Sequence, residues 1–158
     1  MSTTRNIAHI RRFVLVSWPR RPADRYRLDG DYVELVWAEL LGPAATAVAR
    51  RIAHHGAAGD THVPIEAIST ALGITPRRAV EALRRLHHHG LIAFAEADAV
   101  IATTGHVPGL SPRQVARLSR YATASHVHLT QTSGRLPTIK DLAGRAAPQQ
   151  SEQAIGWS

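Results

Sequence analysis

The side chains of this 158-residue chain that are best suited to chemistry lie in the stretch "GITPRRAVEALRRLHHHGLI", from residue 73 to residue 92. On a helix that begins near Pro76, each residue turns by about 100°. One face is therefore apolar, and the opposite face carries Arg77, Arg78, Glu81, Arg84, Arg85 and His88. Guanidinium groups bind phosphate and can hydrogen-bond guanine at two atoms at once. These residue types indicate contact with nucleic acid; a solvated helix face without a partner is the alternative.

The ten histidines are the second candidate group, because neutral imidazole is a common ligand of zinc, nickel and copper. They gather at residues 54–55, at residue 62 and at residues 87–89. Adjacent residues of a helix point about 100° apart, so three consecutive histidines cannot bind one ion. We expect no metal and no cofactor, and we interpret these histidines as cations that complement the carboxyl ends of helices. A metal site or a pH sensor is the alternative.

Enzymatic chemistry has no candidate site in the sequence. The chain has no cysteine, which excludes thiolate nucleophiles, disulfides and thiolate zinc sites. It contains neither a nucleophile-elbow motif nor a glycine-rich phosphate loop. Asp29 with Asp31, and Glu96 with Asp98, are interpreted as loop and cap residues. We therefore expect that the protein is not an enzyme.

The charge distribution favours a polyanionic partner. The formal net charge is +7, and eighteen of the nineteen basic residues are arginines, a bias typical of a GC-rich bacterial genome. Residues 1–29 carry a net charge of +5, whereas residues 30–129 and 130–158 each carry +1. No apolar run approaches the roughly 18 residues that span a bilayer. We expect no membrane association, and a cytoplasmic protein associated with the nucleoid.

The spacing of prolines, glycines and apolar residues predicts the elements that position these side chains. A short strand ends at Pro19, and helices cover residues 31–41, 43–56, 65–72 and 76–89. A hairpin follows over residues 91–103, and a last helix over residues 111–129. The fold class is mainly α with a small β-hairpin. Its parts are a basic arm (1–29), a domain (30–129) and a flexible tail (130–158).

The stretch "VPIEAISTALGITPRRAVEALRRLHHHGLI" resembles the winged helix-turn-helix domain of GntR- and MarR-type bacterial transcriptional regulators. A valine precedes a short helix, "ALGIT" forms the turn, and a Leu-x-x-x-Gly-Leu-Ile junction leads into the wing. The resemblance covers residues 44–104. It implies a winged helix-turn-helix, to which the predicted N- and C-terminal helices are additions. Residues 105–158 show no pattern of the effector-binding domain that GntR proteins carry after the wing.

The resemblance implies sequence-specific binding of double-stranded DNA, with helix 76–89 in the major groove. The N-terminal residues of such a helix lie nearest the bases, so Arg77, Arg78 and Glu81 are the candidate base contacts. Glu81 would accept a hydrogen bond from cytosine or orient an arginine. Arg84 and Arg85, further along the helix, are candidate phosphate contacts.

Further phosphate contacts are expected outside the exposed helix face. The hydroxyl of Thr75 would cap the helix and touch a phosphate. Arg11, Arg12, Arg20 and Arg21 of the basic arm would follow the DNA backbone or enter the minor groove. A solvated tail is the alternative for this arm.

The tip of the wing departs from the family pattern, because Glu96 and Asp98 stand where DNA-contacting wings usually carry arginine or lysine. Carboxylates repel phosphates, so this wing is expected to point away from DNA or to face a protein partner. Two alternative functions follow. One is a winged-helix adaptor that binds protein, and the other is an architectural protein that coats DNA without sequence preference.

The last predicted helix carries an apolar stripe at helical spacing. The stripe consists of Val115, Leu118, Ala122, Ser125 and Leu129. Such a stripe docks on the core of its own domain or pairs with its copy. Because regulators of this kind commonly bind two-fold operators, a homodimer is expected.

Overall fold

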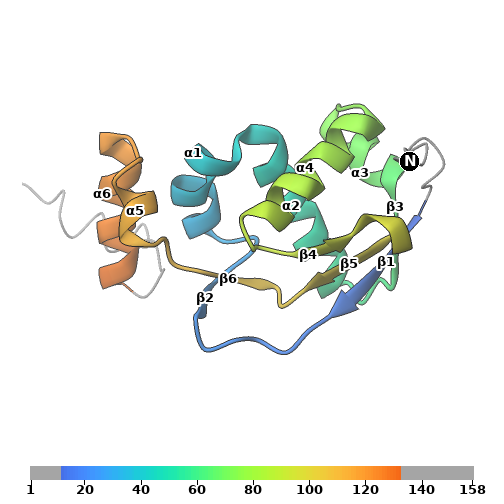
Figure 1. Ribbon diagram of the computed structural model, residues 1–158, viewed down its shortest axis with the longest axis horizontal. Coiled ribbons are helices and arrows are strands. Elements are labelled where there is room, and N and C mark those ends of the chain that lie inside the picture. Colours follow the sequence, from blue (N-terminus) through green and yellow to red (C-terminus); the bar gives the residue numbers. More distant parts are fainter. Residues whose placement is uncertain (1–11, 133–158) are drawn as a thin grey trace, which may run out of the picture.

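The computed structural model describes residues 12–132, which form a group of helices on one face of a small sheet (Figure 1). The strands are β1 (Arg12–Ser17), β2 (Asp24–Arg27), β3 (His62–Pro64), β4 (Ala93–Ala95), β5 (Val100–Thr103) and β6 (His106–Pro108). The helices are a π-helical turn (Val33–Trp37), α1 (Ala38–Leu41), α2 (Pro43–Ala57), α3 (Ile65–Leu72), α4 (Pro76–His88), α5 (Pro112–Val115) and α6 (Arg120–Gln131). A 3-10 turn (Glu96–Asp98) joins β4 to β5. The coarse expectation of a mainly helical protein with little β-structure is confirmed.

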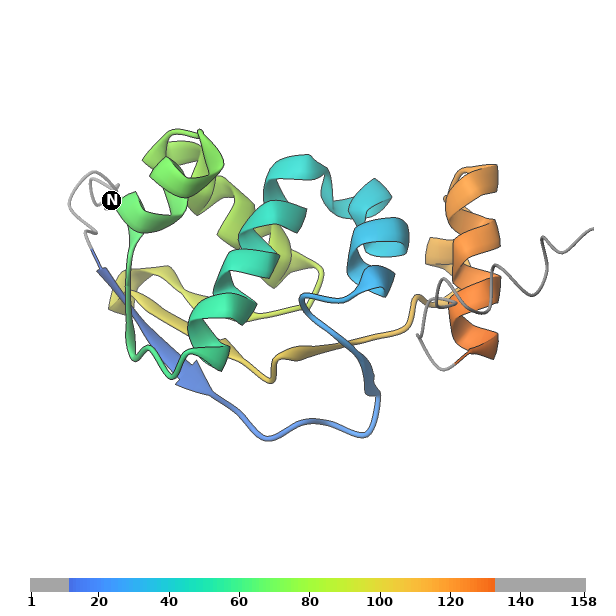
Figure 2. The ribbon, with the colours of Figure 1, turned by 180° about the vertical axis from the view of Figure 1, so that it is seen from behind.

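Four strands form a sheet in the order β3-β1-β5-β4. β1 is antiparallel to β3 and parallel to β5, and β4 and β5 form the expected antiparallel hairpin. Side chains alternate along β1, since Phe13 and Leu15 are buried whereas Val14 is 38% exposed. One face of the sheet therefore packs against the helices, and no helix within residues 12–132 covers the other (Figures 1 and 2).

Residues 12–29 of the expected basic arm (1–29) belong to the folded body. β1 lies between β3 and β5, and β2 pairs with β6 in a separate two-stranded ribbon. Phe13 and Leu28 are fully buried. Burying one such side chain contributes about 1.5–3 kcal/mol to the free energy of folding. The neighbouring arginines add no cost of charge burial, because they are exposed. Arg11 lies outside the described residues.

The helices α2, α3 and α4 cover the inner face of the sheet, as Figure 2 shows from behind. Val48, Ile68 and Leu83, one from each helix, are fully buried in their shared core. All three helices lie where the sequence predicts them. Gly73 ends α3 in the left-handed conformation, with φ of +64°. The Thr75 hydroxyl then accepts a hydrogen bond from the Arg78 amide at 3.2 Å, which confirms the predicted cap of α4.

The prediction of one continuous helix over residues 111–129 is wrong, because a turn separates α5 from α6. The amide of Ser119 leaves the helical pattern and donates to the Glu39 carboxylate at 2.8 Å. The Ser119 hydroxyl accepts a hydrogen bond from the Ala122 amide at 3.2 Å, which starts α6 afresh. A carboxylate on a distant segment thus competes with the helical bonds of this stretch.

The α6 helix docks against the π-helical turn at residues 33–37. Its residues Ala122 and Leu129 are buried, so this part of the stripe packs on the protein's own core. The hydroxyl of Tyr32 accepts the Leu110 amide at 3.0 Å and lies 2.7 Å from Nδ1 of His126. The predicted flexible tail begins inside α6, and residues 133–158 lie outside the described part. Within residues 12–132, no helix has the length and apolar character needed to cross a membrane.

Candidate nucleic-acid interface

The α4 helix presents one buried face and one exposed face, as the sequence predicts. Ala79, Val80, Leu83 and Leu86 are buried against the core. Pro76 occupies the first turn, where the lack of an amide hydrogen costs no hydrogen bond. With the cap made by Thr75, this fixes where the helix starts. The side chains opposite the core are therefore held on a capped helix that is packed against α2 and α3.

The first turn of α4 carries two arginines in different electrostatic settings. The side chain of Arg77 is 87% exposed, and its Nε lies 3.3 Å from Oε1 of Glu81. Ion pairs at such exposure contribute at most about 1 kcal/mol, so a ligand can displace Glu81. The geometry is compatible with the predicted orienting role of Glu81. Arg78 is exposed and forms no ion pair with any residue from 12 to 132.

The turn between β4 and β5, which the sequence predicts to be the tip of a wing, folds back onto α4. The guanidinium group of Arg84 donates from Nε to Oε2 of Glu96 at 2.8 Å and from Nη2 to Oε1. The hydrogen bonds and positive charge of Arg84 lower the pKa of Glu96. Arg84, a predicted phosphate contact, thus has its charge balanced by the wing. The other wing carboxylate, Asp98, is exposed and has no ion pair among the described residues.

Arg85 keeps its full positive charge. Its Nη2 donates to the carbonyl oxygen of Leu40, in the last turn of α1, at 3.1 Å. A carbonyl is a neutral acceptor, so the bond orients the guanidinium group without neutralising it. Arg85 therefore lies at the junction of α4 and α1, where it is exposed.

The structure does not bring Arg20 and Arg21 to the α4 surface. Arg21 makes two hydrogen bonds to the buried carboxylate of Asp24, at 2.9 and 3.0 Å, and Nε of Arg20 donates to the Asp24 carbonyl at 2.6 Å. The β1–β2 connection that carries both arginines lies across the molecule from the α3–α4 turn (Figures 1 and 2). Both side chains hold this connection in place. Arg12 is exposed at the start of β1, opposite Pro64 of β3.

The histidines make local contacts. Nδ1 of His87 accepts the Phe94 amide at 3.1 Å, which ties the end of α4 to β4. Nδ1 of His55, near the end of α2, lies 2.7 Å from the Asp60 carboxylate. Burial first, and then the charges of His88, Arg85 and Arg117, lower the pKa of His89. No group of three potential metal ligands occurs within the described residues.

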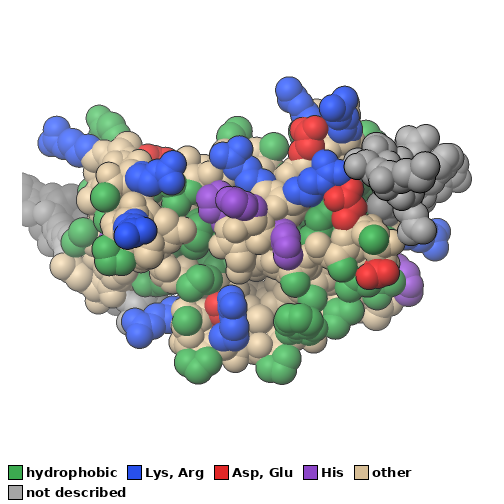
Figure 3. All heavy atoms as spheres, in the orientation of Figure 1, with side chains coloured by type: hydrophobic (Ala, Val, Ile, Leu, Met, Phe, Trp, Pro, Cys, Tyr) green, Lys and Arg blue, Asp and Glu red, His purple; other side chains and the backbone are tan. Residues whose placement is uncertain are grey.

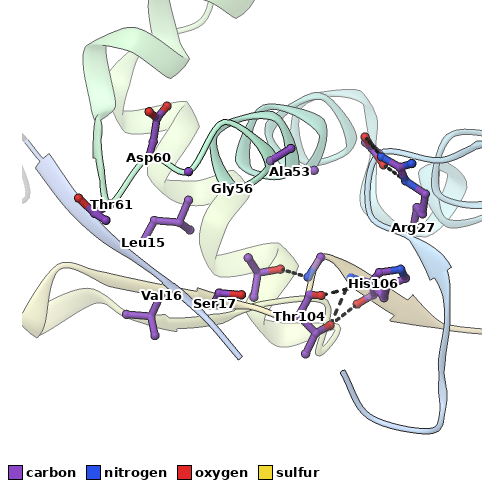
Figure 4. A pocket seen from close by; sticks show the side chains of 15 residues that line it. Leu15, Val16, Ser17, Arg27, Ala53, Gly56, Asp60, Thr61, Thr104 and His106 are labelled. Carbon is purple, nitrogen blue, oxygen red and sulfur yellow. Dashed lines mark hydrogen bonds and ion pairs between the residues drawn. The ribbon is translucent and has the colours of Figure 1, made fainter. Parts of the chain in front are cut away.

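A hollow of about 510 Å³ lies where β1, β5 and α2 end (Figure 4). Leu15 and Ala53 are among its apolar lining residues. The Thr104 hydroxyl donates to the His106 carbonyl at 2.8 Å and accepts the His106 amide at 3.2 Å. Arg27, also in the lining, is paired with Asp29 at 2.9 Å. These polar groups hold the surrounding loops to one another, on the far side of the body from the α3–α4 turn.

Comparisons with known proteins leave the family of this chain open. No protein-family model matches the chain, and no curated protein sequence matches it. Among solved structures, the chain is similar to primosome protein DnaB (residues 1–300) from Geobacillus stearothermophilus, with a TM-score of 0.47 and 15% sequence identity. The match covers 83% of this chain and 53% of the other, so the chain spans about half the length of that structure. A likeness at this level carries no inference about function.

Proposed function

We propose that the protein binds double-stranded DNA sequence-specifically, as a winged helix-turn-helix transcriptional regulator. The order and packing of α2, α3 and α4, followed by the β4–β5 hairpin, support this interpretation of the fold. In this interpretation α4 is the recognition helix and lies in the major groove. β1, which enters the sheet between β3 and β5, is an addition to the pattern that the sequence resembles.

The observation that carries the proposal is the setting of Arg78. It lies in the first turn of a capped helix, is exposed, and has no acidic partner among residues 12–132. An arginine that is free of carboxylates can make the bidentate bond to guanine O6 and N7 that specifies a base. Arg77 would contact a neighbouring base, with Glu81 orienting its guanidinium group.

The predicted phosphate contacts differ in how free they are to bind DNA. Arg85 is the stronger phosphate contact, because the hydrogen bond that its guanidinium group makes among the described residues is to a neutral carbonyl. Arg84 would reach phosphate only after its pair with Glu96 opens. The wing therefore restrains the recognition helix and does not itself lie on the DNA. The Thr75 hydroxyl is already used by the helix cap.

Selection of bound sequences from a random pool of duplexes tests the proposal, followed by binding titrations on the selected and a scrambled duplex. Arg78→Ala should weaken binding to the selected duplex by about 5- to 150-fold, from the 1–3 kcal/mol of one bidentate base contact. Its effect on the scrambled duplex should be small. Arg25→Ala is the matched control, because Arg25 is an exposed arginine of β2 with no ion pair among the described residues. Equal losses for both variants would contradict the assignment of α4.

A protein-binding adaptor is the second candidate, and the exposed carboxylate of Asp98 at the wing tip favours it. The two candidates differ at low salt, where an adaptor would show no measurable binding to any duplex. Binding without a selected motif would instead indicate an architectural role.

We also propose a homodimer. Tyr121 and Val127 are exposed on α6 and form the candidate contact surface, which sedimentation of Tyr121→Ser would test.

A further inference from the structure

The segment from α5 to α6 is positively charged and contains no acidic residue. No aspartate or glutamate occurs between residues 99 and 140 of the sequence. Arg113, Arg117 and Arg120 are all exposed, and none of their guanidinium groups has an ion pair or hydrogen bond within residues 12–132. Elsewhere in the described chain, carboxylates pair with five arginines. These are Arg21, Arg27, Arg50, Arg77 and Arg84.

This basic cluster, Arg113, Arg117 and Arg120, lies on the same side of the molecule as the exposed face of α4. Figure 3 shows basic side chains over α4 that continue over α5 and α6 on the one visible face. An electrostatic effect agrees with this placement. The positive charge of Arg117 contributes to the lowered pKa of His89, at the C-terminal end of α4.

The α1 helix fixes the distance between α4 and the basic cluster. Two consecutive residues of α1, Glu39 and Leu40, bond to the two basic regions. The Leu40 carbonyl accepts from Arg85 of α4 at 3.1 Å, and the Glu39 carboxylate accepts from the amide and hydroxyl of Ser119 at 2.8 and 2.6 Å. The two basic surfaces are therefore held in one arrangement before any ligand binds, which lowers the ordering cost of using both together.

The dimensions of DNA suggest what the cluster contacts. A helix of the length of α4, 13 residues, extends about 20 Å, and the major groove is about 12 Å wide. If the first turn of α4 is at the base edges, its C-terminal end lies over the backbone that borders the groove. The basic cluster is joined to that end of α4 through α1, because Arg85 bonds to the Leu40 carbonyl and Ser119 bonds to the Glu39 carboxylate.

We propose that Arg113, Arg117 and Arg120 form a second contact with duplex DNA, binding phosphates that flank the groove occupied by α4. This inference rests on the proposed DNA-binding function. Phosphate contacts carry no sequence information, so the cluster adds affinity and fixes the orientation of the duplex. The cluster takes the electrostatic role that the sequence predicted for Arg20 and Arg21. Those two arginines instead bond to Asp24.

The test is a salt titration of the full chain on a 24-base-pair duplex with the selected site at its centre. The triple variant Arg113→Ala/Arg117→Ala/Arg120→Ala should lower the slope of log affinity against log salt by about 0.9 for each lost phosphate contact. At 0.1 M salt, this change of slope corresponds to a loss of about eight-fold in affinity for each contact. The ratio of affinities for selected and scrambled duplexes should not change. Arg25→Ala should leave the slope as it is.

A lysine variant separates charge from any structural role of these arginines. Arg113→Lys/Arg117→Lys/Arg120→Lys should keep most of the wild-type slope, because a phosphate contact needs only a positive charge. Thermal unfolding of each variant shows whether the fold is retained.

Two outcomes would overturn the inference. In the first, Arg78→Ala weakens binding to the selected duplex while the alanine triple variant keeps the wild-type slope; the proposed function then stands without the second contact. In the second, the triple variant loses affinity only for single-stranded DNA of the same sequence. That result would assign the cluster to single strands, with the 83% exposed Tyr121 beside it as a stacking surface. If the wild-type chain prefers no duplex, the proposed function itself fails.

Discussion

Under the proposed function, the ion pair between Glu96 of the predicted wing and Arg84 of α4 predicts that removing one carboxylate strengthens DNA binding. Glu96→Gln keeps the shape of the side chain but removes the charge that balances Arg84. The freed guanidinium group lies on the same exposed face as Arg78 and Arg85. We therefore expect the variant to bind duplex DNA of any sequence more tightly than the wild-type chain does.

The size of the gain follows from the number of contacts that become available. One additional phosphate contact raises the salt slope by about 0.9 and the affinity by up to about eight-fold at 0.1 M salt. The cost in stability is small. The side chains of Arg84 and Glu96 are 43% and 31% exposed, and an ion pair in such a setting contributes at most about 1 kcal/mol.

Fluorescence anisotropy of a labelled duplex at four or five salt concentrations measures both quantities. Asp98→Asn is the matched control, because it removes a second wing carboxylate that has no arginine partner in residues 12–132. It should raise affinity slightly through the weaker overall field and leave the slope unchanged. A second control is Glu96→Gln in an Arg84→Ala background, where no contact can be gained.

Two results would refute this reasoning. If Glu96→Gln and Asp98→Asn change affinity equally and neither changes the slope, Arg84 does not reach DNA when it is released. If the gain of Glu96→Gln persists in the Arg84→Ala background, it comes from the wing itself. The wing would then lie close to the DNA backbone, contrary to the proposed arrangement.

Three further predictions concern the elements that hold the site. Thr75→Ala should lower the free energy of unfolding by about 1 kcal/mol, whereas Thr75→Ser should retain it, because only alanine loses the cap of α4; chemical denaturation measures both. Tyr32→Phe leaves the buried Leu110 amide without its acceptor and should cost about 1–3 kcal/mol, and amide hydrogen exchange should rise in α6 but not in α4. Burial raises the pKa of Asp24, but the bonds from Arg21 outweigh it, and the net pKa is lowered. The stability from Asp24 is thus present above its unfolded pKa of about 4 and lost as the pH falls through the folded value; Asp24→Asn should flatten the acid-induced loss measured by denaturation between pH 5 and 2.

Much of the α4 region could be predicted from local sequence. Gly73, Thr75 and Pro76 determine where α4 starts, since a left-handed residue, a capping hydroxyl and a residue without an amide hydrogen each favour one position. The alternation of apolar and charged side chains along the helix then determines which face is buried. Both kinds of information lie within about four residues of the position they determine. For this reason the sequence predicts correctly that Arg77 is exposed and that Leu83 is buried.

The partners of the arginines could not be predicted, because they come from distant segments. Arg84 meets Glu96 twelve residues later, and Arg85 meets a carbonyl of α1 forty-five residues earlier. A charge count along the chain placed the basic excess in residues 1–29. It could not show that Arg21 is committed to Asp24.

The β1 strand and the break before α6 show the same limit in the backbone. The apolar residues of β1 were visible as a short strand, but its place between β3 and β5 depends on strands more than forty residues away. The continuous helical pattern of residues 111–129 was interrupted by the carboxylate of Glu39, eighty residues earlier in the chain.

Local sequence was enough to predict α2, α3, α4, the β4–β5 hairpin and the exposed arginine face of α4, because hydrophobic periodicity and capping act over a few residues. Which arginines are left without a carboxylate depends instead on how the chain packs. Ion pairs and backbone acceptors depend on distances between segments far apart in sequence, and those distances exist only after the core has packed. Arg78, Arg113, Arg117 and Arg120 are left without carboxylates in the described fold, whereas Arg21 and Arg84 are not.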